Sequence, residues 1–530
     1  LLCFILLSLT RPEGYLVFGV LLFITFLRQF LGRETDNHDK PVLMGLFFVV
    51  GVAPHLFFQW WYYGSVLPNT FYAKTTGGWP QILTGLSSLR DFFLAFPLLI
   101  ILLCLPLLAL IRPGWFLPVA RKNVLMLGVL SLIWVGYVVG VGSDFMPFFR
   151  FFVPVIPILV VLAVWGIQAL SVLHKRRVTF TILLLVFIPL HTGVNYLSDK
   201  VYVAFVSHRS TIVGEVVGKW LRNNVAEQHT IAVNTAGSLP YFAGHRTLDM
   251  LGLTDPQIAH RPVYVTTIGW SGHRRGWGQY VLTKRPRVII FYNTAGSPEP
   301  FYLGDRELAN SAVFRFFYSL RAVRLQVNPA TGAPAEPFWW VLGFPFDETR
   351  QGGVELNNLG IKCQTFREPL AWTEFREGMI TFYYFLFDTS LETLWQNDLL
   401  LNTSAEKLLS RSIHLWSEQN KNRPQADVSV RQEVLTLCQR ARQLVEQNKM
   451  KQAKTVLSRA VELNRQAQLP IVPQHVANVA LMSKDLWTAV AAQKEALRLD
   501  PDNELYKKNL ISLLTVPYER FKKKQRRLEK

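Results

Sequence analysis

The sequence predicts a polytopic α-helical membrane domain, an extracytoplasmic mixed α/β domain and a C-terminal region of α-helical repeats. Half of the 530 residues are hydrophobic, and the apolar runs concentrate in the first 200 positions. Short β-type runs then alternate with Gly- and Pro-rich stretches, and from about residue 404 Ala, Leu, Gln, Lys and Arg recur at helical spacing. Since one core usually stops growing near ~250 to 300 residues, we expect separate domains at 1–200, 201–400 and 401–530.

The membrane domain is predicted from six apolar runs that are long enough, or nearly so, to cross the ~30 Å hydrocarbon core as helices. These runs are residues 15–31, 42–62, 92–111, 124–141, 151–173 and 178–197. Residues 1–9 have the composition of another helix, and the chain starts inside this run without a Met. We therefore expect a further segment before Leu1.

Basic residues predict the orientation of these helices, because Lys and Arg concentrate in cytoplasmic loops. They cluster after the first, third and fifth runs, at Arg28, Arg33, Lys40, Arg112, Arg121, Lys122 and the HKRR stretch 174–177. The other loops, 10–14, 60–74 and 142–150, then lie outside, as does the chain from about residue 200. We expect a multi-pass protein of the inner (cytoplasmic) membrane whose soluble C-terminal region is extracytoplasmic.

Charge and cysteine usage limit the partners and cofactors. The net charge of +19 fits the loops named above and the basic tail at 522–527, so we expect no nucleic-acid partner. The four cysteines show neither a disulfide framework nor metal-ligand spacing. The sequence therefore indicates no cofactor and no metal site, and it leaves divalent-metal dependence open.

The α/β domain is predicted from short runs with the composition of buried strands. Examples are TIAV at 230–233 and RVIIFY at 287–292. The segment 234–255, NTAGSLPYFAGHRTLDMLGLTD, is rich in turn residues and is both polar and aromatic, which suits a loop at the domain edge. Together these patterns indicate a mixed α/β domain.

An internal repeat predicts paired helices in the C-terminal region. Three alanines recur 36 positions later, giving the pairs Ala441 and Ala477, Ala453 and Ala489, and Ala460 and Ala496. This spacing resembles the tetratricopeptide (TPR) pattern, whose small residues let two helices pack closely. Leu457 fills the large-residue position of one copy, whereas Gln493 departs from it in the other. Because two copies are fewer than the ~3 that usually stand alone, we expect them to pack on the neighbouring domain; an ordinary helical bundle is the alternative.

The first outer loop, TRPEG, carries charges that are costly in lipid, so Arg11 and Glu13 should face a cavity or each other. A guanidinium at the membrane surface can bind two oxygens of a phosphate. The alternative is a device that starts a helix, with Pro12 in the first turn, Glu13 at the favourable end of the dipole and Arg11 reaching head groups.

The second outer loop, YYGSVLPNTFYAK, combines aromatic rings, an amide and an ammonium. This set suits a sugar phosphate, with Tyr63 and Tyr72 against the sugar, Asn69 on a hydroxyl and Lys74 on the phosphate. An aromatic belt at the membrane interface explains the aromatic residues equally well without any function.

The third outer loop, GSDFMPFFR, places Asp144 and Arg150 on either side of an apolar stretch. A plain salt bridge between them is one interpretation. In the other, Arg150 suits phosphate, while Asp144 suits a sugar hydroxyl or a basic partner.

These motifs, followed by AGSLPYFAGHRTLDMLGLTD, resemble in the same order those of GT-C glycosyltransferases that use polyprenyl-phosphate sugars. The terminal β-(1→2)-arabinofuranosyltransferase family is the nearest likeness, over roughly residues 1–260. The resemblance implies a GT-C-like membrane domain and transfer of a sugar, arabinofuranose being one candidate, from a polyprenyl-phosphate donor to a cell-envelope glycan or glycoconjugate. Ser143 stands where the family usually has a second Gly, and the TPR-like tail is not a family feature.

The resemblance also assigns candidate roles. The general base is expected before Leu1, so the catalytic residue is not identified, and Asp144 is a candidate assistant. Arg11, Lys74 and Arg150 are the candidate ligands of the donor phosphate. The candidate sugar-binding residues for donor or acceptor are Glu13, Tyr63, Asn69, Tyr72, His245, Arg246 and Asp249.

Two other function classes stay open. A non-catalytic membrane scaffold would recruit a protein partner of the cell envelope through the TPR-like repeats, and the upstream sequence would lack an outer loop with paired acids. A small-solute transporter would need polar residues at mid-span, where these runs are apolar. Bulk membrane lipid is an expected partner in every case.

Overall fold

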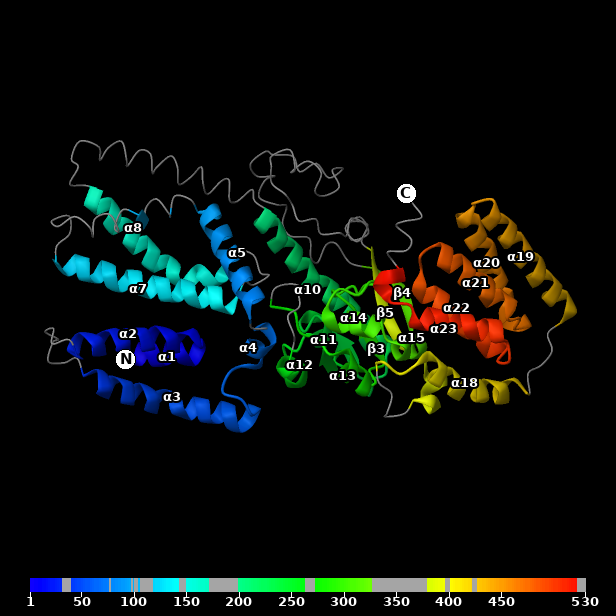
Figure 1. The fold of residues 1–530 in the computed structure, drawn as a ribbon, viewed down its shortest axis with the longest axis horizontal. Helices are drawn as coiled ribbons and strands as arrows, with labels where there is room; N and C mark the ends of the chain where they lie inside the picture. Colours follow the sequence, from blue (N-terminus) through cyan, green and yellow to red (C-terminus); the bar gives the residue numbers. More distant parts are fainter. Residues whose placement is uncertain are drawn as a thin grey trace. The chain divides into compact units, whose positions relative to one another are not determined.

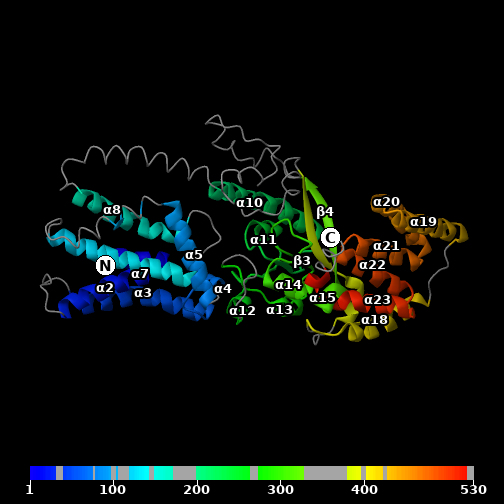
Figure 2. The ribbon, with the colours of Figure 1, turned by 45° about the horizontal axis from the view of Figure 1, so that its top comes forward.

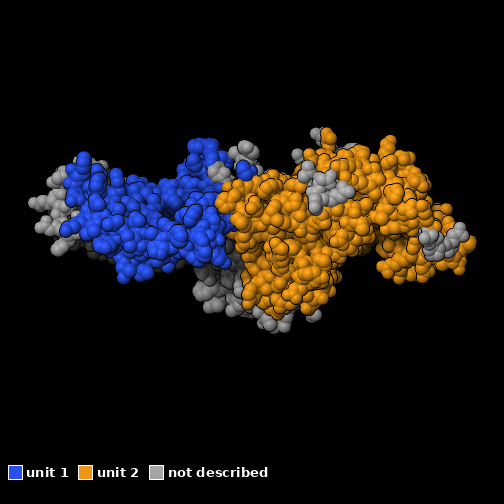
Figure 3. All heavy atoms as spheres, turned by 90° about the horizontal axis from the view of Figure 1, so that it is seen from below, with its two compact units in different colours: residues 1–207, 262–274 blue, residues 208–261, 275–530 orange. Residues whose placement is uncertain are grey.

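The computed structural model describes most of the chain in segments. These are residues 1–30, 40–75, 78–96, 118–142, 149–170, 199–262, 272–326, 379–395, 401–421 and 427–521, with short pieces at 99 and 103–104. Asp144, the expected span at 178–197 and most of that at 92–111 lie outside these segments. The chain forms two compact units: unit 1 holds Leu1–Ser207 and Pro262–Arg274, and unit 2 holds His208–Arg261 and Arg275–Lys530 (Figure 3). Each unit is described by itself.

Unit 1 is built from helices (Figure 1). They are α1 (Leu2–Thr10), α2 (Glu13–Phe30), α3 (Pro41–Tyr63), α4 (Asn69–Lys74), α5 (Trp79–Ala95), α7 (Pro118–Val141), the 3₁₀ helix η1 (Arg150–Val155) and α8 (Ile156–Leu170). Among the residues that the structure describes, two helical stretches are long and apolar enough to cross a membrane, namely Pro41–Tyr63 and Asn123–Val141. They coincide with the expected runs 42–62 and 124–141. Two further apolar helices, Glu13–Leu27 and Arg150–Trp165, are shorter.

Glycines allow these helices to approach closely. Gly14 in α2 lies against α1, and a Cβ built on it would be 2.6 Å from the backbone nitrogen of Ser8. A Cβ on Gly85 of α5 would overlap the carbonyl of Val139 in α7. Small residues at apolar helix interfaces serve this purpose because they let two backbones meet. The positions of α1 and α7 in unit 1 therefore depend on glycine.

Unit 2 contains a five-stranded sheet in the order β2-β1-β3-β5-β4. The strands are β1 (Ile231–Val233), β2 (Thr247–Asp249), β3 (Val288–Ile290), β4 (Tyr318–Gln326) and β5 (Met379–Phe387). β1 pairs in parallel with β2 and β3, and β5 pairs antiparallel with β3 and β4. Strands β1 and β3 confirm the two runs expected at 230–233 and 287–292, and Figure 2 shows the longer β4 beside the helices of this unit.

Both faces of the sheet are covered, as the strand sequences require. Ile231 and Val233 of β1 pack with Val217 and Leu221 of α10 (Asp199–Asn224), whereas Ala232 belongs to the cluster on the opposite face. This alternation follows from the two-residue period of a strand. On the α10 side, α11 (Ser238–Ala243) contributes Leu239 and Ala243 to the same cluster. The opposite face is covered by the short helices α13 (Gly278–Thr283), α14 (Leu303–Ala309) and α15 (Ala312–Phe317) and by C-terminal helices. A further short helix, α12 (Pro256–His260), follows β2.

Some of the C-terminal helices share a core with the sheet. The helices of this region are α18 (Ala405–Asn420), α19 (Val428–Glu446), α20 (Met450–Ala467), α21 (Ile471–Met482), α22 (Leu486–Leu499) and α23 (Glu504–Thr515), preceded by η5 (Thr389–Leu394). Trp487 of α22 packs edge-on against Phe385 of β5 with ring centroids 4.9 Å apart, and its Nε1 donates to the Pro298 carbonyl at 2.7 Å. The second copy of the repeat therefore packs on the neighbouring sheet through α22, as expected, whereas the buried residues of α19 and α20 form clusters of their own.

The repeat alanines lie where the sequence pattern predicts. All six are buried: Ala441, Ala453, Ala460, Ala477, Ala489 and Ala496. Gln493, which departs from the pattern, is buried as well, and its Nε2 donates to the Tyr506 carbonyl of α23 at 3.2 Å. The polar side chain is tolerated because the neighbouring helix supplies an acceptor.

Candidate functional site

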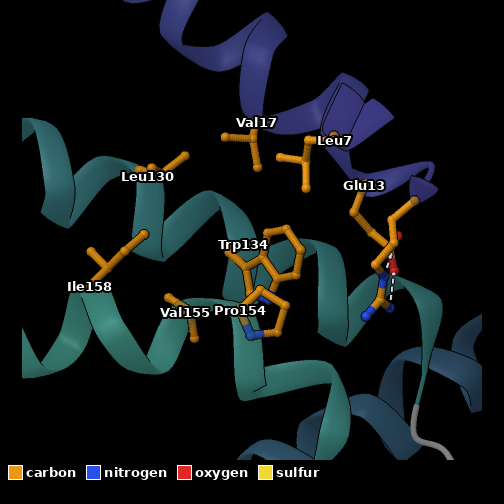
Figure 4. A pocket seen from close by; sticks show the side chains of 10 residues that line it. Leu7, Glu13, Val17, Leu130, Trp134, Pro154, Val155 and Ile158 are labelled. Atoms are coloured by element: carbon orange, nitrogen blue, oxygen red, sulfur yellow. Dashed lines mark hydrogen bonds and ion pairs between the residues drawn. The ribbon is translucent and has the colours of Figure 1, made fainter. Parts of the chain in front are cut away.

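Unit 1 contains an apolar cavity of about 280 Å³. It lies between the α1–α2 hairpin on one side and α7, η1 and α8 on the other (Figure 4). Eight lining residues are apolar or glycine: Leu7, Gly14, Val17, Leu130, Trp134, Pro154, Val155 and Ile158. The other two, Arg11 and Glu13, make one end of the cavity charged. A cavity of this composition accepts an apolar chain along its length and a polar or charged group at the end that carries Arg11.

Arg11 and Glu13 form a bidentate ion pair at that end. Arg11 Nη2 donates to Glu13 Oε1 at 2.9 Å and Nε donates to Oε2 at 3.3 Å, as the dashed lines at Glu13 mark (Figure 4). The Glu13 side chain is 12 % exposed, whereas Arg11 is 53 % exposed. Because Pro12 separates the two helices, Arg11 ends α1 in an extended conformation and Glu13 begins α2. The guanidinium is therefore oriented by Glu13 and remains accessible.

The opposite wall is held by aromatic contacts. Trp134 Nε1 donates to the Phe151 carbonyl at 2.9 Å, which connects α7 to η1. The rings of Phe92 and Phe152 stack with centroids 4.4 Å apart. Arg150 is the first residue of η1, with its Cζ 5.5 Å from the centre of the Phe151 ring, and it is exposed rather than part of the cavity lining.

The residues expected in the second outer loop lie at and after the end of α3. Tyr63 is the last residue of α3 and is exposed. Asn69 begins α4, and Lys74 ends it. The Tyr72 hydroxyl lies 3.0 Å from Ser65 Oγ. This contact connects the turn at Gly64 and Ser65 to α4.

A later segment of the chain, which sequence reasoning missed, reaches this part of unit 1. Gly272, in a left-handed conformation, lies beside the stem of Lys74: a Cβ built on it would be 3.7 Å from Lys74 Cγ. Arg274 Nη2 donates to Thr84 Oγ1 of α5 at 3.4 Å, and these two residues are 190 positions apart. No local pattern could reveal such contacts. Arg274 is therefore an additional basic residue that lies against α5.

Two of the three residues expected on the acceptor side support local structure in unit 2. His245 is buried, with Nδ1 2.9 Å from the Ala243 carbonyl oxygen and Nε2 3.0 Å from that of Val225. Asp249 is 1 % exposed and accepts from the backbone N–H groups of Leu251 and Thr254 at 2.9 and 2.8 Å.

Burial raises the pKa of Asp249, although these hydrogen bonds oppose the shift. Arg246, between the two, is exposed. Of the three expected residues, it is the one with a side chain open to solvent.

A buried carboxylate that sequence reasoning missed lies where β1 and β3 end. Asp305 is 0 % exposed and accepts from Asn234 Nδ2 at 2.8 Å and from the backbone N–H groups of Tyr292, Phe301 and Tyr302. Burial raises its pKa to about 6. The segment Asn-Thr-Ala-Gly-Ser follows both strands, at 234–238 and at 293–297, and this repetition was the available signal.

The structure thus brings Arg11 and Glu13 together at a cavity, whereas Asp144 falls outside the described residues. Within the described segments, no group of three or more His, Cys, Asp or Glu residues is arranged to hold a metal ion.

Comparison with known proteins adds one finding. A family model described as "Domain of unknown function (DUF8728)" matches residues 204–334, which include most of α10 and strands β1 to β4. No curated protein and no solved structure matches the chain significantly. The matched family covers part of unit 2, and the cavity beside Arg11 lies outside it.

Proposed function

We propose that this chain is a multi-pass membrane glycosyltransferase of the GT-C type. It moves a sugar, with arabinofuranose as one candidate, from a polyprenyl-phosphate donor to a glycan or glycoconjugate of the cell envelope. In this proposal the donor binds at the outer face of the cytoplasmic membrane, and the soluble C-terminal region is extracytoplasmic.

The observation that carries the proposal is the match between the cavity in unit 1 and a lipid phosphate. The donor has an apolar isoprenoid chain and a charged phosphate that bears the sugar. The walls contributed by Leu7, Leu130 and Ile158 suit the chain, and Arg11 at the polar end suits the phosphate.

The chemistry follows from where charge develops. When the acceptor oxygen attacks the anomeric carbon, the bond to the phosphate oxygen breaks and negative charge grows on the leaving phosphate. A guanidinium whose direction is fixed beforehand stabilises that charge without reorganisation. Glu13 supplies the fixed direction through its two hydrogen bonds to Arg11. A base, expected before Leu1, takes the proton of the acceptor hydroxyl.

Other residues take supporting roles in this proposal. Lys74 and Arg150 are further candidate cations for the phosphate, and Tyr63, Asn69 and Tyr72 are candidates for the sugar. On the acceptor side, Arg246 is the better candidate, because His245 and Asp249 already use their polar atoms within unit 2.

The test is release of polyprenyl phosphate from a panel of polyprenyl-phosphate sugars by the full-length protein in nanodiscs. We expect one donor to turn over, and Arg11→Ala and Arg150→Ala to lower the rate by roughly 10²-fold, as for other residues that stabilise transition-state charge. Arg90→Ala is the matched control, because Arg90 is exposed and its partners among the described residues are its neighbours Asp91 and Ser87. Equal rates for Arg11→Ala and Arg90→Ala would exclude the proposed role of Arg11.

A membrane scaffold that recruits an envelope protein through the TPR-like repeats is the second candidate. It is favoured by the hairpin of α19 and α20, whose buried residues form clusters of their own with α21, separate from the core shared with the sheet. Figures 1 and 2 show this hairpin at the end of unit 2 away from β3. Absence of donor binding and turnover across the panel would favour the scaffold.

A further inference from the structure

Unit 2 contains a second cavity, also of about 280 Å³. It opens beside the end of α10 and the residues that precede β1 and β3, and β5 supplies its other side. The side chains that matter for its chemistry are Trp220, Asn224, His229, Arg287 and Tyr384. Its lining is both aromatic and polar.

One wall is aromatic. The rings of Trp220 and Tyr384 lie with centroids 5.3 Å apart at 52°, and Trp220 also packs edge-on against Phe382 at 5.5 Å. Both Trp220 and Tyr384 are half-buried, so each presents part of its ring. The electron-rich face of such rings attracts the polarised C–H groups of a saturated ring.

The other wall is polar and carries a positive charge. Arg287 Nη1 donates to the Phe387 carbonyl at 2.5 Å, and its backbone N–H donates to Thr230 at 2.7 Å, so the guanidinium has a fixed direction. Throughout the described segments, no carboxylate pairs with Arg287. A guanidinium has five N–H donors, and those not used by Phe387 are available to a ligand.

Two polar side chains stand beside it. His229 is half-buried, and none of the described residues makes a hydrogen bond to its imidazole. Asn224 uses its Nδ2 on the Trp220 carbonyl at 2.8 Å, which leaves the amide oxygen as an acceptor for a hydroxyl. A cation, an imidazole, an amide and two aromatic rings thus line one small cavity.

We propose that this cavity binds a monosaccharide unit that carries a carboxylate or a phosphate. The sugar ring packs on Trp220 and Tyr384, the anion pairs with Arg287, and hydroxyls bond to Asn224 and His229. A neutral sugar would leave Arg287 without a counter-ion, and a bare anion would leave the aromatic wall unused. This site lies in unit 2 and does not depend on glycosyl transfer by unit 1.

Binding to the full-length protein in detergent, measured by calorimetry, tests the proposal with five probes. They are glucuronate, glucose 6-phosphate, glucose, inorganic phosphate and AMP. We expect saturable binding of glucuronate or of glucose 6-phosphate, and whichever binds identifies the source of the anion. Affinity for glucose and for inorganic phosphate should be at least tenfold weaker. The proposal would be overturned if neither acidic sugar bound saturably, or if AMP bound more tightly than the acidic sugars. It would also be overturned if glucose or inorganic phosphate bound as tightly as the acidic sugars.

Variants assign the binding to this cavity. Arg287→Gln should weaken binding of the acidic sugar at least tenfold, and Arg287→Lys should weaken it less. His229→Ala should weaken it by a smaller factor, about threefold, and it removes no hydrogen bond among the described residues, so the fold should persist. Arg459→Gln, an exposed arginine of α20, is the control and should bind as the wild type. Unchanged affinity in both Arg287→Gln and His229→Ala would overturn the site.

Discussion

Arg315 Nη1 donates to the Leu513 carbonyl at 2.9 Å, and so joins α15 beneath the sheet to the last turn of α23, 198 residues later. The same nitrogen reaches the Val516 carbonyl at 2.7 Å, and Nε reaches Ala309 at 2.7 Å. Carbonyls in the last turn of a helix lack partners within the helix, and a cation there is favoured by the helix dipole. Burial lowers the pKa of Arg315 to about 10, which leaves it charged at neutral pH.

Replacing this arginine should destabilise unit 2. Arg315→Met leaves the carbonyl groups of Ala309, Leu513, Leu514 and Val516 without this donor. Hydrogen bonds from a charged donor contribute about 1.5–3 kcal/mol each without being additive. We expect the free energy of unfolding to fall by about 3 kcal/mol, measured by denaturant titration with tryptophan fluorescence. Arg459→Met, on the surface of α20, should change it by less than about 0.5 kcal/mol. Similar values for the two variants would exclude the role given to Arg315.

Asp305 should make stability depend on pH in an unusual direction. Its pKa is raised from 3.8 to about 6, so the native state holds this proton more tightly than the unfolded state. The stability that Asp305 contributes is therefore fully present below pH 4 and is lost as pH rises toward 6. The loss should be about 3 kcal/mol, since each pKa unit corresponds to about 1.4 kcal/mol.

The variant Asp305→Asn isolates this effect, because other carboxyl groups titrate in both proteins. The Asn234 amide can turn its oxygen toward the new amide group, so the fold should persist. The difference in unfolding free energy, wild type minus variant, should decrease between pH 4 and pH 6.5. A difference that rises or stays flat over this range would contradict the assignment.

The α1–α2 hairpin should not tolerate a side chain at Gly14. A Cβ there would lie 2.6 Å from the Ser8 backbone, whereas a Cβ on Gly19 in the same helix meets nothing within 4 Å. We expect Gly14→Ala to lower the melting temperature in nanodiscs and to weaken donor binding, because it separates the helices that carry Arg11 and Glu13. Gly19→Ala should be nearly neutral. A neutral Gly14→Ala would mean that the helices are not packed this closely.

The paired helices of the C-terminal region should be sensitive at the repeat alanines. Ala460 is 0 % exposed in α20, and the larger side chain of Ala460→Leu must displace its neighbours. Overpacking of this kind typically costs about 1–3 kcal/mol, which denaturant titration detects. Ser458→Leu, at an exposed position of the same helix, should have little effect. Equal stability of the two variants would argue against the helix pairing.

Sequence patterns within short segments predicted the strands, the buried repeat alanines and the charged pair of the first loop. The runs around Ile231 and Ile289 could be identified as strands because short apolar runs between turn signals are typical of buried strands. The alanine spacing predicted buried helix contacts, and TRPEG predicted charges that face a cavity or each other. In the structure Arg11 and Glu13 do both.

The parts that sequence reasoning missed depend on residues far apart in the chain. Asn234 and Asp305 are 71 positions apart, and Arg274 and Thr84 are 190 apart. Contacts of this kind leave no periodicity to recognise. The polar character of His245 and Asp249 suggested a ligand, yet buried polar groups are usually satisfied within the protein, as these two are.

The most direct test of the central claim is to locate the donor lipid. A polyprenyl phosphate with a photoreactive group in its isoprenoid chain would be cross-linked to the full-length protein in nanodiscs, and the labelled peptides identified by mass spectrometry. Our account predicts labels at 7–17, 130–134 and 154–158, with a decrease in Arg11→Gln and none in Arg90→Gln. Labels that favour exposed apolar positions such as Val49 and Val50 of α3, and that Arg11→Gln leaves unchanged, would contradict it.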